Sequence, residues 1–379
     1  MILILLVAFA CSALATVAVI GSARAHGHWS ADHDMSGPQK MHVKAVPRIG
    51  GLGIFAGILG GCVALALLYP ETAHTVELLV VCMLPAFLSG MWEDFTKAIS
   101  PRRRMVALAL SGLLGVMLVG GSILRTGWQP FDHLLAVAGL MWLGSAGAVL
   151  AVTGIANSVN IIDGMNGLAS MTVAMTTAAL ACIAWRVGDD LILGIALSTL
   201  AATLGFFFWN YPRGLVFLGD GGAYLLGFMV AELGILLAAR HAEVSMMAPL
   251  LLVAYPFFET LFTMYRRRVI KRRPMTQPDG IHLHTLIYRR IKRGEADARG
   301  VSDPTRSNSR TSPYLWMLNA IVVVPAAIWW NNTPALVLSL VAFVLVYLDL
   351  YWRIVTFRSP KWMDSRRDPA PAGEPANES

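Results

Sequence analysis

The sequence from position 148 to 185 reads AVLAVTGIANSVNIIDGMNGLASMTVAMTTAALACIAW. Two long apolar runs flank a polar stretch, residues 157–167, which holds five amide, hydroxyl or carboxylate side chains and two glycines. Each apolar run is long enough to predict a membrane-spanning helix. A structureless polar loop in lipid would be very costly, so the polar stretch predicts either a functional site or an ordinary polar turn with a helix N-cap.

A second glycine-rich stretch favours the functional interpretation. Residues 217–222 read Phe-Leu-Gly-Asp-Gly-Gly and place one carboxylate, Asp220, beside another apolar run. In the first stretch, Asn160 and Asp163 offer the hard oxygen ligands that Mg²⁺ prefers, and the glycines let the backbone approach a ligand. The two stretches are therefore predicted to face one another across a single metal-phosphate site.

The composition is that of an integral membrane protein. Of the 379 residues, 56% are hydrophobic and only 14% are charged, and the mean hydropathy is +0.60. The 4 cysteines lie inside apolar runs without CxxC spacing, so neither disulfides nor a zinc site is predicted. The net charge of +7 lies against membrane spans, and no nucleic-acid-binding motif is present, so membrane lipids rather than nucleic acid are the expected partners.

The apolar runs predict the fold class. We expect an all-α integral membrane protein, a polytopic bundle of about 11 transmembrane helices. Residues 1–355 would form one membrane domain, and residues 356–379 a flexible cytoplasmic tail. The expected spans are 2–20, 51–69, 76–92, 105–121, 134–155, 167–185, 190–208, 219–238, 246–264, 315–330 and 334–351.

The positions of Lys and Arg predict the orientation. Of these 30 residues, 27 lie in the C-terminal tail from 352 or in alternate connections, namely 21–50, 93–104, 156–166, 209–218 and 265–314. By the positive-inside rule the N-terminus is outside and the C-terminus cytoplasmic. The spans follow from hydropathy alone, yet every polar motif falls on the cytoplasmic side.

Two cytoplasmic connections carry further candidates. In the first, Lys40, His42 and Arg48 would present cations and donors to an anionic ligand; the alternative is ordinary topogenic charge. In the second, Glu93 and Asp94 are adjacent carboxylates at the end of an apolar span, followed by three arginines that would face lipid headgroups or a lipid phosphate. The alternative is a solvated helix end with internal salt bridges.

The segment from 265 to 313 is the longest cytoplasmic piece. From Ile281 its apolar spacing suits a short amphipathic helix at the membrane interface, and His282 and His284 are expected on a turn, where they donate hydrogen bonds to phosphates. Residues 294–312 are polar, and no structure is predicted for them. Glu259, in the ninth span, is either a functional acid or a hydrogen-bond partner of a neighbouring helix.

Together these motifs resemble one family. The chain is similar to the polyprenyl-phosphate N-acetylhexosamine-1-phosphate transferases, which belong to glycosyltransferase family 4, and the matching pieces lie in family order on one predicted side of the membrane. The matching pieces are Lys40 to His42 with Pro47 to Gly51, Glu93 with Asp94, the NxxNxxDGxNGL run at 157–168, Phe217 to Asp220, and the DxxHLH segment at 279–284.

The resemblance implies a reaction. A sugar 1-phosphate, most simply that of GlcNAc, would pass from a UDP-sugar to undecaprenyl phosphate, releasing UMP and starting a lipid-linked surface polysaccharide such as O-antigen. A divalent ion and fixed cations would offset the repulsion between the two phosphates. Mg²⁺ is the expected metal, with Mn²⁺ as an alternative, and the site would lie on the cytoplasmic side of a bacterial inner membrane.

The resemblance also implies roles for individual residues. Asn160 and Asp220 correspond to metal ligands, and Asp94 to the carboxylate that orients or deprotonates the lipid phosphate. Asp163 would lie close to the nucleotide phosphates and act with Asp94 in catalysis. The implied substrate-binding residues are Lys40, His42, Arg48, Glu93, Asn157, Asn166 for uridine, and His282 and His284 for the diphosphate.

Two departures from the family pattern bear on specificity. Glu93 replaces the first of two aspartates found in many relatives, and Thr285 replaces the final His of the HxHH segment. With Asn166, the second departure argues against the branch that uses a peptide-bearing nucleotide and favours the WecA-like and O-antigen branch. The donor stays open between UDP-GlcNAc and 6-deoxy sugars such as FucNAc or QuiNAc, and so does the oligomeric state, including a homodimer.

Two functions from other classes fit the sequence less well. A transporter for an anionic substrate would have paired repeats with polar residues near mid-membrane, whereas here the polar residues cluster at one face. An inactive scaffold for polysaccharide assembly would have lost its metal ligands, yet Asn160, Asp163 and Asp220 are all present. The expected site is a cytoplasm-facing cleft among the inner helices, with a groove open to the bilayer for the prenyl chain.

Overall fold

The computed structural model describes residues 1–23, 46–127, 129–270, 281–299 and 303–356. Helices make up the regular secondary structure of these residues, as the sequence predicts. In chain order they are α1 (Ile2–Gly21), α3 (Gly51–Leu68), η1 (Pro70–Thr72), α4 (Ala73–Thr96), α5 (Pro101–Leu114), η2 (Gly115–Val119), α6 (Gln129–Val137), α7 (Trp142–Ile162), α8 (Leu168–Val187), α9 (Asp190–Asn210), α10 (Gly219–Arg240), α11 (Met247–Leu252), α12 (Ala254–Tyr265), η3 (Arg266–Ile270), α13 (Leu283–Arg299), α14 (Pro304–Ile328) and α15 (Thr333–Val355).

The polytopic membrane fold is confirmed, although the count of eleven spans is not. Among the described residues, 9 helices are long and apolar enough to cross a bilayer. The other two expected spans are interrupted. Residues 105–121 fall on α5 and the π-helix η2, after which Gly120 turns the chain out of the helix at φ +76°. Residues 246–264 fall on α11 and α12, which are separated at Val253.

One predicted boundary is wrong. The fifth span was expected at 134–155, followed by a connection at 156–166, but α7 begins at Trp142 and continues to Ile162. Asn157 and Asn160 therefore lie on the last turns of a helix rather than in a loop. Hydropathy could not predict this because a helix end that faces other protein groups can carry amides at no cost to its backbone hydrogen bonds.

The prediction of no structure for residues 294–312 is also wrong. α13 continues through Arg299, and α14 begins at Pro304, where the Asp303 side chain accepts the backbone N–H of Thr305 at 2.9 Å. Proline at the first helical position and an aspartate cap are typical of a helix start. The small polar residues that follow, from 307 to 312, are largely buried against the protein, which is why their polarity does not indicate a loop.

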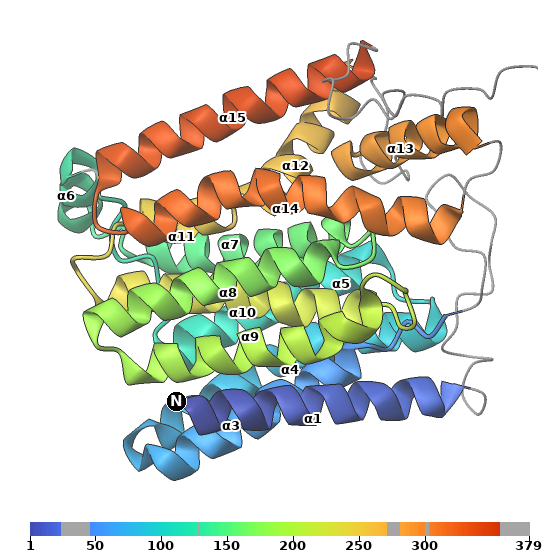
Figure 1. Cartoon of the computed structure of the whole chain (residues 1–379). Coiled ribbons are helices and arrows are strands. Elements are labelled where there is room, and N and C mark those ends of the chain that lie inside the picture. Colours follow the sequence, from blue (N-terminus) through green and yellow to red (C-terminus); the bar gives the residue numbers. More distant parts are fainter. Residues whose placement is uncertain (24–45, 128, 271–280, 300–302, 357–379) are drawn as a thin grey trace, which may run out of the picture.

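The most enclosed helix is α10. It packs against α3, α4, α7, α8 and α9, and 94% of an 18-residue apolar stretch of this helix is buried, compared with 22% for α1 and 17% for α15 at the periphery (Figure 1). A helix that is apolar all round is expected in such a position. Because its N-terminus carries Asp220, the centre of the bundle also fixes the position of the candidate site.

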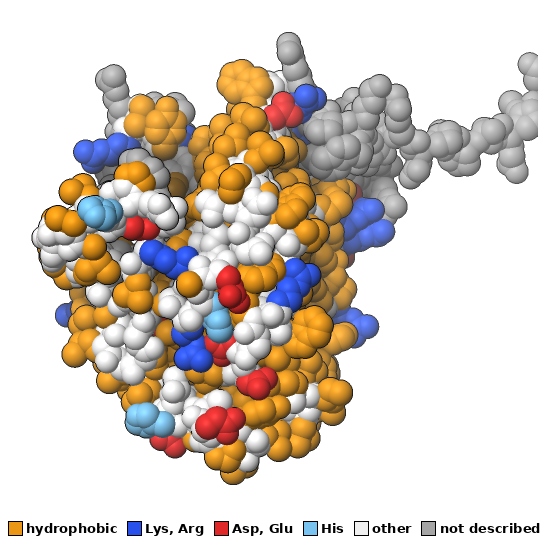
Figure 2. Space-filling view, turned by 90° about the vertical axis from the view of Figure 1, so that its left-hand side faces the viewer, with side chains coloured by type: hydrophobic (Ala, Val, Ile, Leu, Met, Phe, Trp, Pro, Cys, Tyr) orange, Lys and Arg blue, Asp and Glu red, His pale blue; other side chains and the backbone are white. Residues whose placement is uncertain are grey.

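The far end of α10 is fixed by charged groups. Asp189 accepts hydrogen bonds from Arg240 Nε at 2.6 Å and contacts His241 Nε2 at 2.8 Å. Arg125 Nη2 donates to the carbonyls of Ala238, His241 and Val244, which satisfies acceptors that a helix end leaves free. Figure 2 shows this end of the molecule, where acidic, basic and histidine side chains lie within a hydrophobic surround.

Candidate active site

The site is built around the start of α10. Gly219 adopts φ +74°, a left-handed conformation that favours glycine, and turns the chain into the helix. The preceding segment pairs with residues 47–51: Phe217 donates its N–H to the Pro47 carbonyl at 2.8 Å, and Gly50 donates to the Phe217 carbonyl at 3.0 Å. This pairing brings Arg48 to the same place as Asp220.

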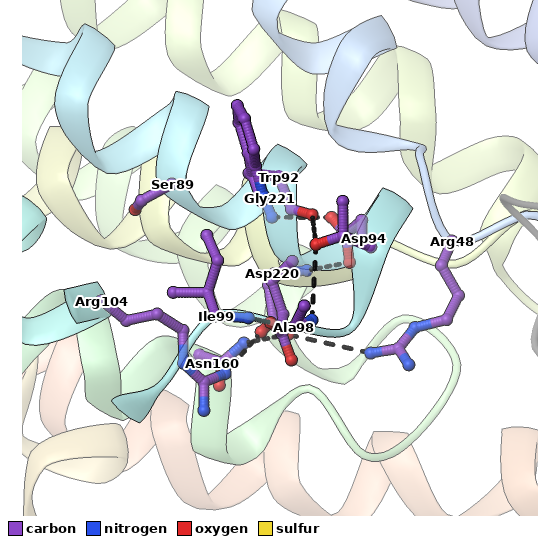
Figure 3. Close-up of polar contacts among 12 residues, drawn as sticks. Arg48, Ser89, Trp92, Asp94, Ala98, Ile99, Arg104, Asn160, Asp220 and Gly221 are labelled. Atoms are coloured by element: carbon purple, nitrogen blue, oxygen red, sulfur yellow. Dashed lines mark hydrogen bonds and ion pairs between the residues drawn. The ribbon is translucent and has the colours of Figure 1, made fainter. Parts of the chain in front are cut away.

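Asp220 collects donors from three other elements (Figure 3). Asn160 Nδ2 on α7 donates to Asp220 Oδ1 at 2.9 Å, and Arg104 Nη1 on α5 donates to Oδ2 at 2.8 Å. Arg48 Nη2 lies 3.8 Å from Oδ1, at ion-pair distance. Since the Asp220 side chain is only 11% exposed, these donors offset the cost of holding its charge away from water.

Asp94 fixes the backbone beneath Asp220. Its Oδ1 accepts the N–H of Asp220 and its Oδ2 the N–H of Gly221, each at 2.9 Å, and the residue is 2% exposed. The first N–H groups of a helix have no acceptor within the helix, so a carboxylate there satisfies them and interacts favourably with the helix dipole. Asp94 thus positions Asp220, and its contact with a lipid phosphate stays a prediction.

Glycines let α3 and α4 approach α10 this closely. A Cβ placed on Gly90 of α4 would lie 2.5 Å from the carbonyl carbon and oxygen of Asp220, and nearer still to Gly221 N. A Cβ on Gly51 of α3 would lie 2.7 Å from the Cα of Gly222. The glycines are therefore required by backbone contact between helices as well as by turns.

Asp163 adds a second carboxylate to the site. It follows the last residue of α7, and burial raises its pKa, which the Asp220 carboxylate raises further and Arg48 lowers. Repulsion between two neighbouring carboxylates favours a cation between them. Asn157 lies one turn before Asn160, on a similar face of α7, and is partly exposed.

Asn166 is held by α14. Its backbone N–H donates to Asn308 Oδ1 at 2.8 Å, and its carbonyl accepts from Ser312 Oγ at 2.6 Å. Its side-chain Nδ2 has longer contacts with Ser309 Oγ at 3.4 Å and the Pro212 carbonyl at 3.5 Å, and the residue is 3% exposed. These contacts secure the loop; a role in uridine recognition stays a prediction.

The two histidines lie at the start of α13 and are both buried. The expected turn is wrong for His284, which lies on the first turn of α13, whereas His282 precedes the helix and its Nδ1 lies 3.1 Å from Glu259 Oε1. Hydrogen bonds from the two rings to phosphates stay a prediction. Glu259 is also bonded to Leu283 N–H and the Tyr347 hydroxyl, so hydrogen bonding to neighbouring elements accounts for this acid. His284 packs beside the polar loop, where a Cβ on Gly164 would lie 2.6 Å from its Nε2.

Burial lowers the pKa of His284 to about 3, so its imidazole is neutral near pH 7. A neutral ring can donate one hydrogen bond but adds no positive charge for a diphosphate. The parallel ring of His282 lies 5.3 Å away, measured between ring centroids.

Of the three other residues that the sequence predicts at the site, the structure describes Glu93. Glu93 is partly buried, and its Oε2 accepts the N–H of Ile99 at 2.9 Å, which stabilises the turn between α4 and α5. Lys40 and His42 lie outside the described residues.

Sequence reasoning missed two sets of site residues. Arg104 was grouped with arginines facing lipid headgroups or a lipid phosphate, but it binds Asp220. Pro101 after Ser100 signals the start of α5 and would have placed Arg104 on its first turns. The second set lies on α14. Its residues are spaced so that they fall on one face of a helix, and this spacing indicates the helix: 305, 308, 309, 312 and 316.

The donor set fits a hard divalent cation. Two carboxylates, Asp163 and Asp220, and the carboxamide of Asn160 offer oxygens of the kind that Mg²⁺ takes, and Mg²⁺ keeps several waters or phosphate oxygens besides. No group of three His, Cys, Asp or Glu side chains within metal-binding reach occurs in the part of the chain that the structure describes. Arg48 and Arg104 supply the cationic groups around Asp220.

Known proteins are similar to this chain in sequence. The family profile described as Glycosyl transferase family 4 matches residues 76–238, which include Asp94, Asn160 and Asp220. A Bacillus subtilis (strain 168) protein named probable undecaprenyl-phosphate N-acetylglucosaminyl 1-phosphate transferase is 30% identical over 255 residues, which are 66% of this chain and 68% of that protein. The chain belongs to glycosyl transferase family 4.

Other relatives extend the comparison within glycosyl transferase family 4. A phospho-N-acetylmuramoyl-pentapeptide-transferase of Streptococcus pneumoniae (strain Hungary19A-6) is 28% identical over 259 residues, 67% of this chain and 76% of that protein. One from Oceanobacillus iheyensis is 31% identical over 213 residues, 53% of this chain and 64% of that protein. The polar half of α14 lies beyond the residues that match the family profile.

Proposed function

We propose that this chain transfers an N-acetylhexosamine 1-phosphate, first of all that of GlcNAc, from a UDP-sugar to undecaprenyl phosphate. A lipid-phosphate oxygen attacks the sugar-bearing phosphorus of the donor, and the bond to the UMP phosphate breaks. The products are the undecaprenyl-diphosphate sugar and UMP. The relatives' printed names support this reaction, since one names undecaprenyl phosphate and an N-acetylglucosaminyl 1-phosphate.

The single observation that carries the proposal is the charge arrangement around Asp220. Carboxylates and arginines from four elements meet at the N-terminus of an enclosed helix, which itself favours anions. Arg48 and Arg104 would bind phosphate oxygens when Asp220 takes a divalent ion, Mg²⁺ or Mn²⁺. That ion would supply charge neutralisation between donor and acceptor; Asn160, Asp163 and Asp220 would hold it.

The proposed reaction also gives roles to the other predicted site residues. Asp94 keeps Asp220 in position, Asn157, Asn166 and His284 surround the donor, and Lys40 and His42 would bind anionic substrates. Because a phosphate monoester is largely ionised near neutral pH, its second pKa being about 6, the acceptor needs no strong base. We further propose that the site faces the cytoplasm of a bacterial inner membrane and starts a surface polysaccharide such as O-antigen.

The test is UMP release by purified protein in detergent with undecaprenyl phosphate, Mg²⁺ and a panel of UDP-sugars that includes UDP-GlcNAc, UDP-FucNAc and UDP-QuiNAc. Activity with one donor that is lost on adding EDTA and in Asp220→Ala supports the proposal and identifies the sugar. Asp349→Ala is the matched control, because this acid is exposed on α15 and pairs only with Arg353 among the contacts described. No UMP from any donor by folded protein would favour a scaffold or transporter instead.

A further inference from the structure

The first turns of α14 contact the polar loop at 163–167 through four side chains. Asn308 and Ser312 bond the two backbone polar groups of Asn166, as described above. Ser309 bonds the Pro212 carbonyl and lies against the Asn166 side chain, and Trp316 Nε1 donates to the Gly167 carbonyl at 3.1 Å. We call Asn308, Ser309, Ser312 and Trp316 the loop clamp.

The helix that carries the loop clamp is itself bonded to α13. Glu295 of α13 accepts from Ser307 Oγ at 2.5 Å and from Arg310 Nη1 at 2.8 Å, so α13 and α14 form one unit. His284 of that unit contacts Gly164, at the other end of the same loop. The loop is thus held at both ends by elements that come more than a hundred residues later in the chain.

The loop is also held by a few short-range hydrogen bonds of its own and by α9. Gly167 has φ +73°, and its Cα packs against Phe207 and Tyr211, where a Cβ would lie 2.9 Å from each side chain. Its N–H donates to Asn210 Oδ1 at 2.6 Å, which leaves the Asn166 peptide groups to α14. Since an unpaired buried peptide group is costly, removing a clamp contact favours another loop conformation.

We propose that the loop clamp sets the affinity for the nucleotide-sugar donor, and leaves that for the lipid acceptor unchanged. This rests on the proposed function, in which residues 163–166 lie at the donor. The clamp residues act as positioning residues, because their contacts are with the loop and, for Ser309, also with the Pro212 carbonyl. The acceptor phosphate would instead meet Arg48 and Arg104, which lie against Asp220.

The kinetic test compares Ser312→Ala and Trp316→Phe with Thr311→Val. The second variant keeps an aromatic ring beside Tyr211 and removes the indole donor together with part of the ring system. Thr311 is a matched control: it is buried on the same helix, but its hydroxyl bonds only the Ser307 carbonyl among the contacts described. We expect a rise of about tenfold in the donor KM for Ser312→Ala and a smaller rise for Trp316→Phe, with the acceptor KM unchanged.

An equal rise in both KM values, or the same donor effect in Thr311→Val, would overturn the proposal. Hydrogen–deuterium exchange without substrates tests the contact independently of the reaction. Peptides covering 160–170 should exchange faster in Ser312→Ala than in the wild type and Thr311→Val. Unchanged exchange overturns the clamp even in an active transferase, whereas a wild type that releases no UMP overturns the proposed function, so the two failures are distinguishable.

Discussion

The hydrogen-bond partners of Asp94 bear on whether this carboxylate acts on substrate or stabilises the fold. The resemblance to known transferases implies a group that meets the lipid phosphate, whereas both of its oxygens accept backbone N–H groups of α10. These two roles predict different consequences for the same substitution. A group that acts only on substrate can be neutralised without loss of stability, but a group that satisfies buried amides cannot.

Asp94→Asn should therefore destabilise the protein as well as lower UMP release. The carboxamide keeps one acceptor oxygen and turns an N–H₂ group toward a backbone N–H, which costs about 1–3 kcal/mol of unfolding free energy. Thermal unfolding in detergent measures the loss. Glu93→Gln is the control, since the amide oxygen can still accept from Ile99. Full stability with lost activity in Asp94→Asn would return Asp94 to a direct role on substrate.

His284 makes a prediction about pH. Its folded pKa of about 3 lies below the unfolded value of about 6.5, so below pH 6.5 only the unfolded chain takes up the proton. Stability should fall as pH falls. Between pH 7.5 and 5.5 the wild type should lose about 1.4 kcal/mol more than His284→Gln.

Thermal unfolding at the two pH values checks this difference. His133→Gln, on the exposed surface of α6, controls for removal of a histidine. Equal pH dependence in the wild type and His284→Gln would contradict the buried neutral imidazole.

The residues that sequence predicted best are those whose chemistry is rare in membrane spans. Asn160 and Asp220 were singled out as oxygen ligands, and they are in contact. Asn166 and His282 were also noticed, but their hydrogen-bond partners lie on other helices, 142 residues away on α14 and 23 residues away on α12. A single sequence does not show which residues of different helices form hydrogen bonds with one another. The type of residue was therefore predictable, and its partner was not.

At the scale of the helix, α4 approaches α10 closely because Gly90 has no side chain at the contact. Gly90→Ala should separate α4 from α10, because the added Cβ meets the backbone of Asp220 and Gly221, which no rotamer change can relieve. We expect a loss of about 1–3 kcal/mol of unfolding free energy and a large loss of UMP release.

The matched control is Gly147→Ala. A Cβ there would lie 3.8 Å from Ile123 Cδ1, an ordinary contact in the interior of α7, so stability should stay the same or rise. Melting temperature and activity in detergent distinguish the two variants. Equal behaviour would contradict the close packing described at the site.

Helix boundaries show what hydropathy can and cannot predict. It found the long apolar helices because transfer into lipid dominates their free energy. It ended the fifth span too early at 155 and left 294–312 without structure, because the buried polar faces of α7 and α14 contact protein instead of lipid. The cap at Asp303 and the polar spacing along α14 were local signals that could have corrected the second error.

At the scale of the whole molecule, orientation is the main open prediction. The basic residues predict that the turn after α10 is outside and the start of α5 is cytoplasmic. Glu243→Cys and Arg102→Cys place a thiol on these two exposed positions. A membrane-impermeant maleimide should label Glu243→Cys in intact cells and Arg102→Cys only after lysis.

The wild type, whose own 4 cysteines lie in helices, gives the background labelling. Labelling of Arg102→Cys in intact cells would reverse the orientation and place Asp220 on the outer side.

The loop clamp comes later in the chain than the charged centre around Asp220, and this order has a consequence for biogenesis. Ribosomes deliver Arg48, Asp94, Arg104, Asn160 and Asp220 before α10 is complete, so a nascent chain can assemble its charged centre early. The groups that fix the Asn166 loop arrive only with α14. A chain released between these points would hold the charged centre without the contacts that shape its neighbouring loop, and completion of translation is the step that joins them.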